Sequence, residues 1–355
     1  MFSAKEEFAY IRFMNRKNFI TSGASLLAAS VLPAAGVPAF NNDEEESGII
    51  PPYLKKGDTI GITSPAGYIT LEAIQPAIQQ IESWGLKVKP GNSIGKRDFS
   101  FGGTDSERAG DMQQLMDDPE IKAILCARGG YGSVRLIDQL KWDKFKLNYK
   151  WIIGFSDVTV IHSHLSRNLG IASIHSKMCN SFPDDWNKAE PIQVETILSI
   201  KNALMGEKMT YTVVPNEKNR AGIAKGRLVG GNLKTLESLC GSKSDIKTDD
   251  KLLFVEDTGE YLYSIDRMFW SLKRTGKLEK LAGLIIGGFK IKPDDPGEEF
   301  GRTLYDIVLE KVKDYKYPVC FDFPVGHQKN NFAMKCNVVH ELRVGPRNVQ
   351  LNELR

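Results

Sequence analysis

The fold class follows from the stretch WIIGFSDV at residues 151–158. Its apolar beginning is typical of a buried strand, and Ser156 and Asp157 are residue types preferred where a helix begins. Working outward from it, short apolar strands alternate with segments of helical spacing; the strands are 59–63 and 123–126, and the helices are 71–84 and 106–116. This alternation predicts an N-terminal α/β domain built on a parallel sheet.

The second half of the chain has its own set of strands. Apolar runs predict strands at 252–255, 284–287 and 319–323, an amphipathic helix at 264–273 and a hairpin at 338–354. A polar, irregular stretch separates the halves. We therefore expect an N-terminal domain at 53–206, a linker at 207–224 and a β-rich C-terminal α+β domain at 225–355.

The start of the chain has the pattern of a targeting segment. Arg16 and Lys17 precede a run of apolar and small residues at 19–32. Its roughly 14 residues fall short of the ~20 that a membrane-spanning helix needs, so we expect no stable membrane insertion. The pattern predicts an export signal at 1–39, followed by a linker at 40–52 and a periplasmic mature protein; an anchoring amphipathic helix is the alternative.

Length, charge and cysteine usage exclude several function classes. The 355 residues predict about two domains at the usual ~150 residues each. A net charge of +3 with no long basic block argues against a nucleic-acid partner. The five cysteines are widely spaced with no C-x-x-C pair, and no H-E-x-x-H motif occurs, so we expect neither a disulfide framework nor a metal site.

Ser156 is the first candidate for chemistry. A serine at a strand-to-helix turn lies at the rim of the sheet, where helical N–H groups can stabilise an oxyanion. The stretch GFSDV lacks the final glycine of the G-x-S-x-G nucleophile elbow. Because serine also caps helices, a purely structural role stays open.

Two further candidates lie in strand-end loops. His327 follows a predicted strand in the stretch FPVGH, and Glu256 and Asp257 end another. A serine–histidine pair needs a carboxylate to fix the tautomer of the imidazole, but residue types alone do not choose between these two. The glycine-rich loop 128–132 could bring backbone N–H groups to an anion or could be a structural turn.

Six ordered motifs resemble the LD-carboxypeptidase family of serine peptidases, which includes muramoyl-tetrapeptide carboxypeptidases and microcin C self-immunity proteins. They are GDTIG (57–61), RGGYG (128–132), IGFSDVT (153–159), GRLVGGNL (226–233), FVED (254–257) and PVGH (324–327). The resemblance spans residues 53–342. It implies two lobes with the active site between them, no cofactor, a peptidoglycan-derived peptide substrate and a homodimer.

The resemblance also assigns roles to residues. It implies that Ser156 is the nucleophile, Glu256 the orienting acid and His327 the general base. The oxyanion hole would consist of the backbone N–H groups of Gly130 and Asp157. From the same loop we expect Arg128, Gly129 and Tyr131 to contact the substrate, with Arg128 as the candidate for binding its terminal carboxylate.

Two segments depart from the family pattern, and two other functions remain open. The family usually has His-Gly-Pro-Met where this chain has HSKM (175–178), and a Pro-containing strand ending in Gly where it has AMKC (333–336). Both changes leave the expected triad intact but affect the expected substrate pocket. The alternatives are a microcin C-like acyl-sulfamoyl-adenylate amidase and a non-catalytic exported solute-binding protein.

Overall fold

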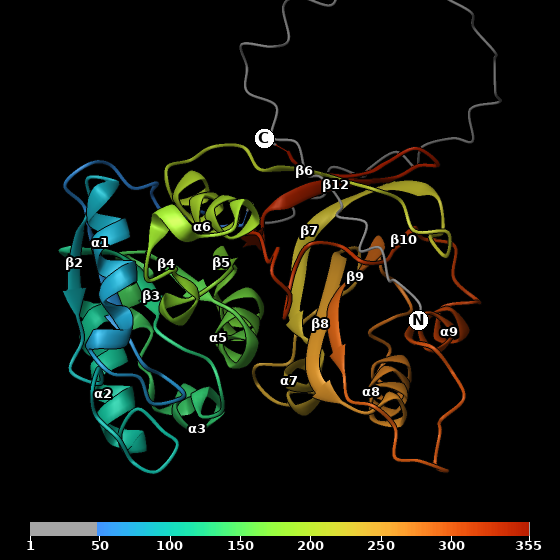
Figure 1. The fold of residues 1–355 in the computed structure, drawn as a ribbon, viewed down its shortest axis with the longest axis horizontal. Coiled ribbons are helices and arrows are strands. Elements are labelled where there is room, and N and C mark those ends of the chain that lie inside the picture. The colour runs from blue at the N-terminus through green and yellow to red at the C-terminus, as the bar shows by residue number, and fades with distance from the viewer. Residues whose placement is uncertain (1–47, 355) are drawn as a thin grey trace, which may run out of the picture.

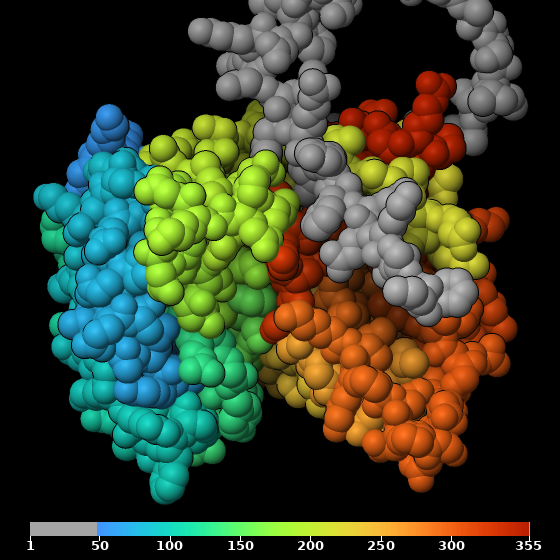
Figure 2. Space-filling view, in the orientation of Figure 1, coloured from blue at the N-terminus to red at the C-terminus, as the bar shows by residue number. Residues whose placement is uncertain are grey.

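Two sheets divide residues 48–354, the part of the chain that the structure describes, into two lobes that lie side by side in the computed structural model (Figure 1). In the space-filling view the lobes touch along a common border, which is notched at its lower end (Figure 2). The N-terminal lobe carries the blue and green elements, and the C-terminal lobe carries most of the yellow, orange and red ones. The two-lobed α/β fold is thus confirmed.

The sheet of the N-terminal lobe has six strands. Their order is β11-β5-β4-β3-β1-β2, and all pairs are parallel except that of β11 with β5. The strands are β1 (Thr59–Thr63), β2 (Lys87–Pro90), β3 (Ile121–Cys126), β4 (Trp151–Gly154), β5 (Ser173–His175) and β11 (Met334–Cys336). The helices are α1 (Gln75–Ser83), α2 (Asp105–Asp117), α3 (Ser133–Leu136), α4 (Asp143–Leu147), α5 (Thr159–His164) and α6 (Pro191–Leu204).

The sheet of the C-terminal lobe has seven strands in the order β10-β9-β8-β7-β12-β13-β6, parallel from β7 to β10 and antiparallel from β7 to β6. The strands are β6 (Thr210–Val213), β7 (Gly222–Asn232), β8 (Leu252–Glu260), β9 (Gly283–Ile291), β10 (Val319–Cys320), β12 (Val339–Val344) and β13 (Val349–Glu353). The helices are α7 (Leu233–Ser238), α8 (Leu262–Arg274) and α9 (Leu304–Lys311). The C-terminal hairpin is therefore confirmed as β12 and β13.

Local sequence explains why these elements form. Helix α2 begins at a capping box. The hydroxyl oxygen of Thr104 accepts a hydrogen bond from the N–H of Glu107, and the carboxylate of Glu107 accepts one from the N–H of Thr104. Helix α8 buries one face against its sheet, and the buried residues are Ile265, Met268, Phe269 and Leu272. In β3 and β4 almost every side chain is buried, as expected for central strands of a parallel sheet with helices on both faces.

Three domain boundaries differ from the expected ones. The expected linker at 207–224 contains β6, because Tyr211 and Val213 alternate with polar residues and point inward. The expected C-terminal domain sends β11 back into the N-terminal sheet, where Met334 pairs with His175. The expected linker at 40–52 is already part of the fold at Ile49, which bridges to Ile171.

The predicted export signal at 1–39 lies outside the described residues. Within residues 48–354, no helix is both long enough and apolar enough to cross a membrane.

Candidate active site

Ser156 lies where β4 gives way to a helix, as the sequence predicts. Its backbone has φ of +62°, in the left-handed region that residues other than glycine seldom adopt. Such strain costs about 1–3 kcal/mol and persists only where the surrounding structure enforces it, which is typical of nucleophile elbows. The hydroxyl is half-buried, so the turn presents it at the rim of the sheet.

The glycine-rich loop runs beside Ser156. A Cβ on Gly129 would lie 3.2 Å from the Cβ of Ser156, which is tighter than an ordinary contact, so glycine favours this close approach of the loop. Gly130 has φ of +113°, and its N–H has no hydrogen-bond acceptor among the described residues. The loop therefore offers a free backbone donor next to the serine, in the place expected for one half of an oxyanion hole.

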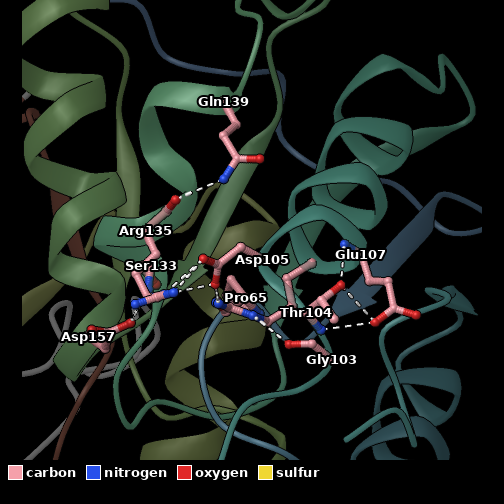
Figure 3. A network of polar contacts seen from close by, with 10 residues as sticks. Pro65, Gly103, Thr104, Asp105, Glu107, Ser133, Arg135, Gln139 and Asp157 are labelled. Atoms are coloured by element: carbon pink, nitrogen blue, oxygen red, sulfur yellow. Dashed lines mark hydrogen bonds and ion pairs between the residues drawn. The ribbon is translucent and has the colours of Figure 1, made fainter. Parts of the chain in front are cut away.

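Asp157 fixes the C-terminal end of this loop. Its carboxylate accepts a 2.8 Å hydrogen bond from the backbone N–H of Ser133, the first residue of α3 (Figure 3). Burial raises the pKa of the Asp157 carboxyl above its ordinary value. The side chain of Asp157 thus holds the far end of the loop, and its backbone N–H is the other expected oxyanion donor.

A charged network supports the same loop from the α2 side. Arg135 donates to both oxygens of Asp105 at 2.9 Å, and the buried Arg108 bonds to Asp105 and to the carbonyl of Pro65 (Figure 3). A Cβ on Gly132 would lie 2.5 Å from the guanidinium of Arg108. Arg108 therefore packs directly beneath the loop and leaves it little freedom to move.

Glu256 lies on β8, in the C-terminal lobe. Its side chain is completely buried, and the pairing of β8 with β9 shifts register between Val255 and Asp257. Irregularities of this kind redirect a side chain from its normal place in the strand. Glu256 Oε2 lies 2.5 Å from His327 Nδ1, a short hydrogen bond that fixes the ring.

The loop that carries His327 is held tightly. The N–H of Gly326 donates to Asn331 at 2.8 Å, and the carbonyl of Val325 accepts the N–H of Gly288 at 2.8 Å. Gly326 has φ of +102°, and a Cβ there would lie 2.3 Å from the Cβ of Glu256. Glycine at this position is what lets the histidine loop lie against the glutamate.

The neighbouring carboxylate has a different role. Asp257 accepts hydrogen bonds from the Asn232 side chain at 3.0 Å and from the N–H of Lys234 at 2.8 Å, which fixes the start of α7. Burial raises the pKa of Asp257 to about 6. Of the two carboxylates that the sequence leaves open, only Glu256 therefore contacts the histidine.

The serine and the histidine come from different lobes, and the residue before the serine packs against the histidine. The ring of Phe155, the residue before the serine, lies with its centre 4.9 Å from that of the His327 ring. Within residues 48–354 no hydrogen bond joins the Ser156 hydroxyl to the imidazole. Catalytic hydrogen bonds are often long in the absence of substrate and tighten only when it binds.

The expected substrate contacts of the loop are only partly positioned for that role. Arg128 donates to the carbonyl of Tyr68 at 3.0 Å, so its guanidinium is engaged within the N-terminal lobe. Tyr131 is exposed, and its ring lies 6.0 Å from that of Phe101. Both residues belong to the loop, and within residues 48–354 no hydrogen bond or ring contact joins either of them to His327.

Sequence reasoning missed Lys177 as a site residue. It follows β5, and its ammonium group donates to the backbone carbonyl of Gln328 at 2.7 Å. The signal was the lysine in the HSKM stretch, a charged residue directly after a buried strand. A cavity of about 540 Å³ opens beside His327 and is also lined by Gln328, Lys290 and Arg302.

No group of three or more His, Cys, Asp or Glu side chains in the described part of the chain is arranged to hold a metal ion. The five cysteines are all free, and four of them are buried, as expected for core residues.

Comparison with known protein families gives matches to both lobes. Residues 60–176 match the LD-carboxypeptidase N-terminal domain, and residues 225–342 match the LD-carboxypeptidase C-terminal domain. The two regions contain Ser156, Glu256 and His327.

Individual relatives agree with these domain matches. A protein of Bacillus subtilis named "Probable murein peptide carboxypeptidase" is 35% identical over 80% of this chain and 88% of its own length. The microcin C7 self-immunity protein MccF of Escherichia coli is 26% identical over 84% of this chain and 94% of its own. The crystal structure of muramoyltetrapeptide carboxypeptidase from Oxalobacter formigenes is 26% identical, with a TM-score of 0.73 over 84% of this chain and 99% of that one.

Proposed function

This chain belongs to the LD-carboxypeptidase family, and we propose that it is a serine peptidase that removes the terminal D-Ala from murein tetrapeptides. The bond cut joins the L-centre of a diamino acid, such as meso-diaminopimelate, to D-Ala. The observation that carries the proposal is the 2.5 Å hydrogen bond between buried Glu256 and His327, whose ring packs against Phe155, the residue before a serine with positive φ. A general base oriented by a carboxylate is what a serine nucleophile requires.

In the proposed mechanism His327 takes the proton from the Ser156 hydroxyl, and the serine oxygen attacks the scissile carbonyl. Glu256 holds the proton on Nδ1, so that Nε2 is free to act as the base, and stabilises the imidazolium that forms. The N–H groups of Gly130 and Asp157 bind the oxyanion. Losing one such donor typically costs on the order of 100- to 1,000-fold in turnover.

Collapse of the intermediate then releases the product. His327 gives its proton to the leaving nitrogen of D-Ala, and an acyl-enzyme remains on Ser156. A water molecule, deprotonated by His327, attacks this ester and releases the tripeptide with the serine restored. The protons balance over the cycle, and neither step requires a group from outside the chain other than water.

Location and assembly belong to the same proposal. If the segment 1–39 acts as an export signal, the enzyme trims stem peptides in the periplasm, and the family resemblance suggests that it does so as a homodimer. Cell fractionation and light scattering on the mature protein measure both. Mature protein in the cytosol would overturn the export proposal, and a monomer at micromolar concentration would overturn the dimer.

The direct test is release of D-Ala from a tetrapeptide, followed by mass spectrometry. We expect turnover by the wild-type protein and none above background by Ser156→Ala. Ser163→Ala is the matched control, because Ser163 is a buried serine whose hydroxyl bonds to Ser244 in the other lobe and lies outside the proposed triad. Release by Ser156→Ala at the wild-type rate would reject the nucleophile.

A second candidate is a microcin C-like acyl-sulfamoyl-adenylate amidase, which the 26% identity to MccF favours. Both reactions use the same triad, so active-site variants do not separate them. The two reactions are separated by a competition assay, in which the tetrapeptide and an aminoacyl-sulfamoyl adenosine are offered to the protein together. The peptide should be consumed first, and faster consumption of the sulfamoyl compound would favour the amidase.

A further inference from the structure

Lys177 occupies an unusual place at the junction of the lobes. It belongs to the N-terminal lobe but donates its hydrogen bond to the carbonyl of Gln328, the residue after His327 in the C-terminal lobe. Its ammonium group also lies 5.8 Å from the centre of the Phe155 ring, the same ring that contacts His327. The side chain is thus half-buried beside the proposed base.

The charges around Lys177 are not balanced. Burial, together with the nearby Lys290, lowers the pKa of Lys177 to about 8, and Glu256 opposes this shift. Glu256 is already bonded to His327, and within residues 48–354 neither lysine has an ion-pair partner. A lysine has three donors, and Lys177 uses one of them. Lys290 lines the cavity beside His327 and Gln328, and Lys177 donates to the carbonyl of Gln328, so the two ammonium groups flank the histidine loop with no carboxylate paired to either within residues 48–354.

The substrate of a carboxypeptidase brings an anion, its terminal carboxylate, close to the general base. His327 must protonate the leaving nitrogen, and the carboxylate carbon of a terminal residue is about 2.4 Å from that nitrogen, given N–Cα and Cα–C bonds of ~1.46 and ~1.52 Å. The cation that holds the carboxylate must therefore lie close to His327. Lys177 contacts the adjacent Gln328, and Lys290 lines the same cavity as His327. Arg128 instead donates to Tyr68.

We propose that Lys177 from the N-terminal lobe and Lys290 from the C-terminal lobe bind the terminal carboxylate of the substrate and so make the enzyme a carboxypeptidase rather than an endopeptidase. The inference rests on the proposed function, which it deepens by naming the specificity residues. The carboxylate supplies an anion to the two ammonium groups, and charge-assisted hydrogen bonds to it are the strongest available kind.

The test compares two substrates, a tetrapeptide ending in free D-Ala and the same peptide ending in D-alaninamide. Wild-type kcat/KM should favour the free carboxylate by at least about tenfold. Lys177→Met should lower kcat/KM for the free carboxylate by about 10- to 100-fold and leave the amide nearly unchanged, and Lys290→Met should do the same to a smaller extent. Lys177→Arg should keep the preference. Lys188→Met, at an exposed lysine paired with Asp185, is the matched control.

Three results would overturn the inference while the proposed function stands. The first is an equal loss of kcat/KM on both substrates in Lys177→Met, which means that Lys177 only fixes the Gln328 loop. The second is no loss of kcat/KM on either substrate in that variant. The third is loss of the preference for the free carboxylate in Arg128→Gln instead. No turnover of either peptide by the wild type would overturn the proposed function itself, and the inference with it. If Lys177→Met does not fold by circular dichroism, the exposed Lys290→Met and the charge-preserving Lys177→Arg decide the question.

Discussion

The two halves of the proposed triad are prepared in different ways. In the N-terminal lobe the backbone of Ser156 is strained, and a glycine loop lies against its side chain. In the C-terminal lobe Glu256 and His327 are already joined by a short hydrogen bond inside a tightly braced loop. Each lobe therefore positions its own members of the proposed triad, and activity depends on the contact that brings the two lobes together.

Several elements make that contact, among them α5, whose Ser163 hydroxyl donates to the carbonyl of Ser244. Strand β11 returns to the N-terminal sheet immediately after the histidine loop, and Asn232 donates its N–H to Thr159 on α5 at 3.0 Å. Phe155 and Lys177 complete the junction beside His327. We therefore expect substitutions within one lobe to cause large losses of turnover. Substitutions at the junction should cause smaller losses that depend on the substrate.

The largest effect is expected from breaking the prebuilt pair. Glu256→Gln should lower kcat by about 10⁴-fold, because an amide no longer enforces the tautomer or stabilises the imidazolium. Steady-state D-Ala release measures this loss. Asp257→Asn is the control, since that carboxylate does not contact His327, and it should stay within about tenfold of wild type. Comparable losses in the two variants would contradict the role given to Glu256.

The next effect tests the packing of the histidine loop. Gly326→Ala should lower kcat by about 100-fold, because the new Cβ would collide with Glu256 and displace the His327 ring. Gly297→Ala is the matched control: it also has positive φ, but nothing lies within 4 Å of its Cβ, so it carries the same backbone strain without the collision. Equal activity of the two variants would show that the fit against Glu256 does not matter.

On the serine side we expect a smaller effect. Asp157→Ala removes the acceptor for the buried Ser133 N–H, which should lower the free energy of unfolding by about 1–3 kcal/mol and turnover by about tenfold. Chemical denaturation and the D-Ala assay measure the two losses. Asp157→Asn keeps an acceptor oxygen and should recover most of both; if it is as impaired as Asp157→Ala, the charge and not the hydrogen bond is what matters.

The smallest effect concerns the junction and follows from the inference on Lys177. Its pKa of about 8 means that the ammonium form dominates below pH 8 and is lost above it. The ratio of kcat/KM for the free carboxylate to that for the amide should therefore fall by up to about tenfold between pH 7 and 9. Lys290 and Glu256 also face this group, as does the buried His175, whose pKa lies well below its ordinary value. The ratio should be flat with pH in Lys177→Arg; a fall of the same size there would assign the titration to another group.

The sequence predicts the local chemistry better than the assembly. Ser156 and His327 could be singled out as candidates because strand ends are recognisable from apolar runs and such ends collect functional side chains, while their roles came from the family resemblance. The choice of Glu256 over Asp257 could not be made from residue types, since it depends on a register shift in β8 that redirects one carboxylate.

The elements that cross between the lobes were the hardest to predict. Strand β11 pairs with β5 across a long stretch of chain, since Met334 lies 334 − 175 = 159 residues beyond its partner His175, and no local pattern in a three-residue strand indicates that partner. The same holds for Lys177, whose importance comes from a carbonyl 151 residues away. Long-range pairing is set by the whole fold, which is why the expected boundaries at 207–224 and 225–355 were wrong in these places.

The central claim is that the serine of one lobe and the histidine of the other act as one nucleophile, and covalent labelling tests it without any assumption about the substrate. Wild-type protein treated with a fluorophosphonate should gain one adduct, which peptide mapping places on Ser156. Labelling should be absent in Ser156→Ala and at least about 100-fold slower in His327→Gln. Labelling of Ser156 at an unchanged rate in His327→Gln, or no labelling of the wild type under conditions that label another serine peptidase, would contradict the account.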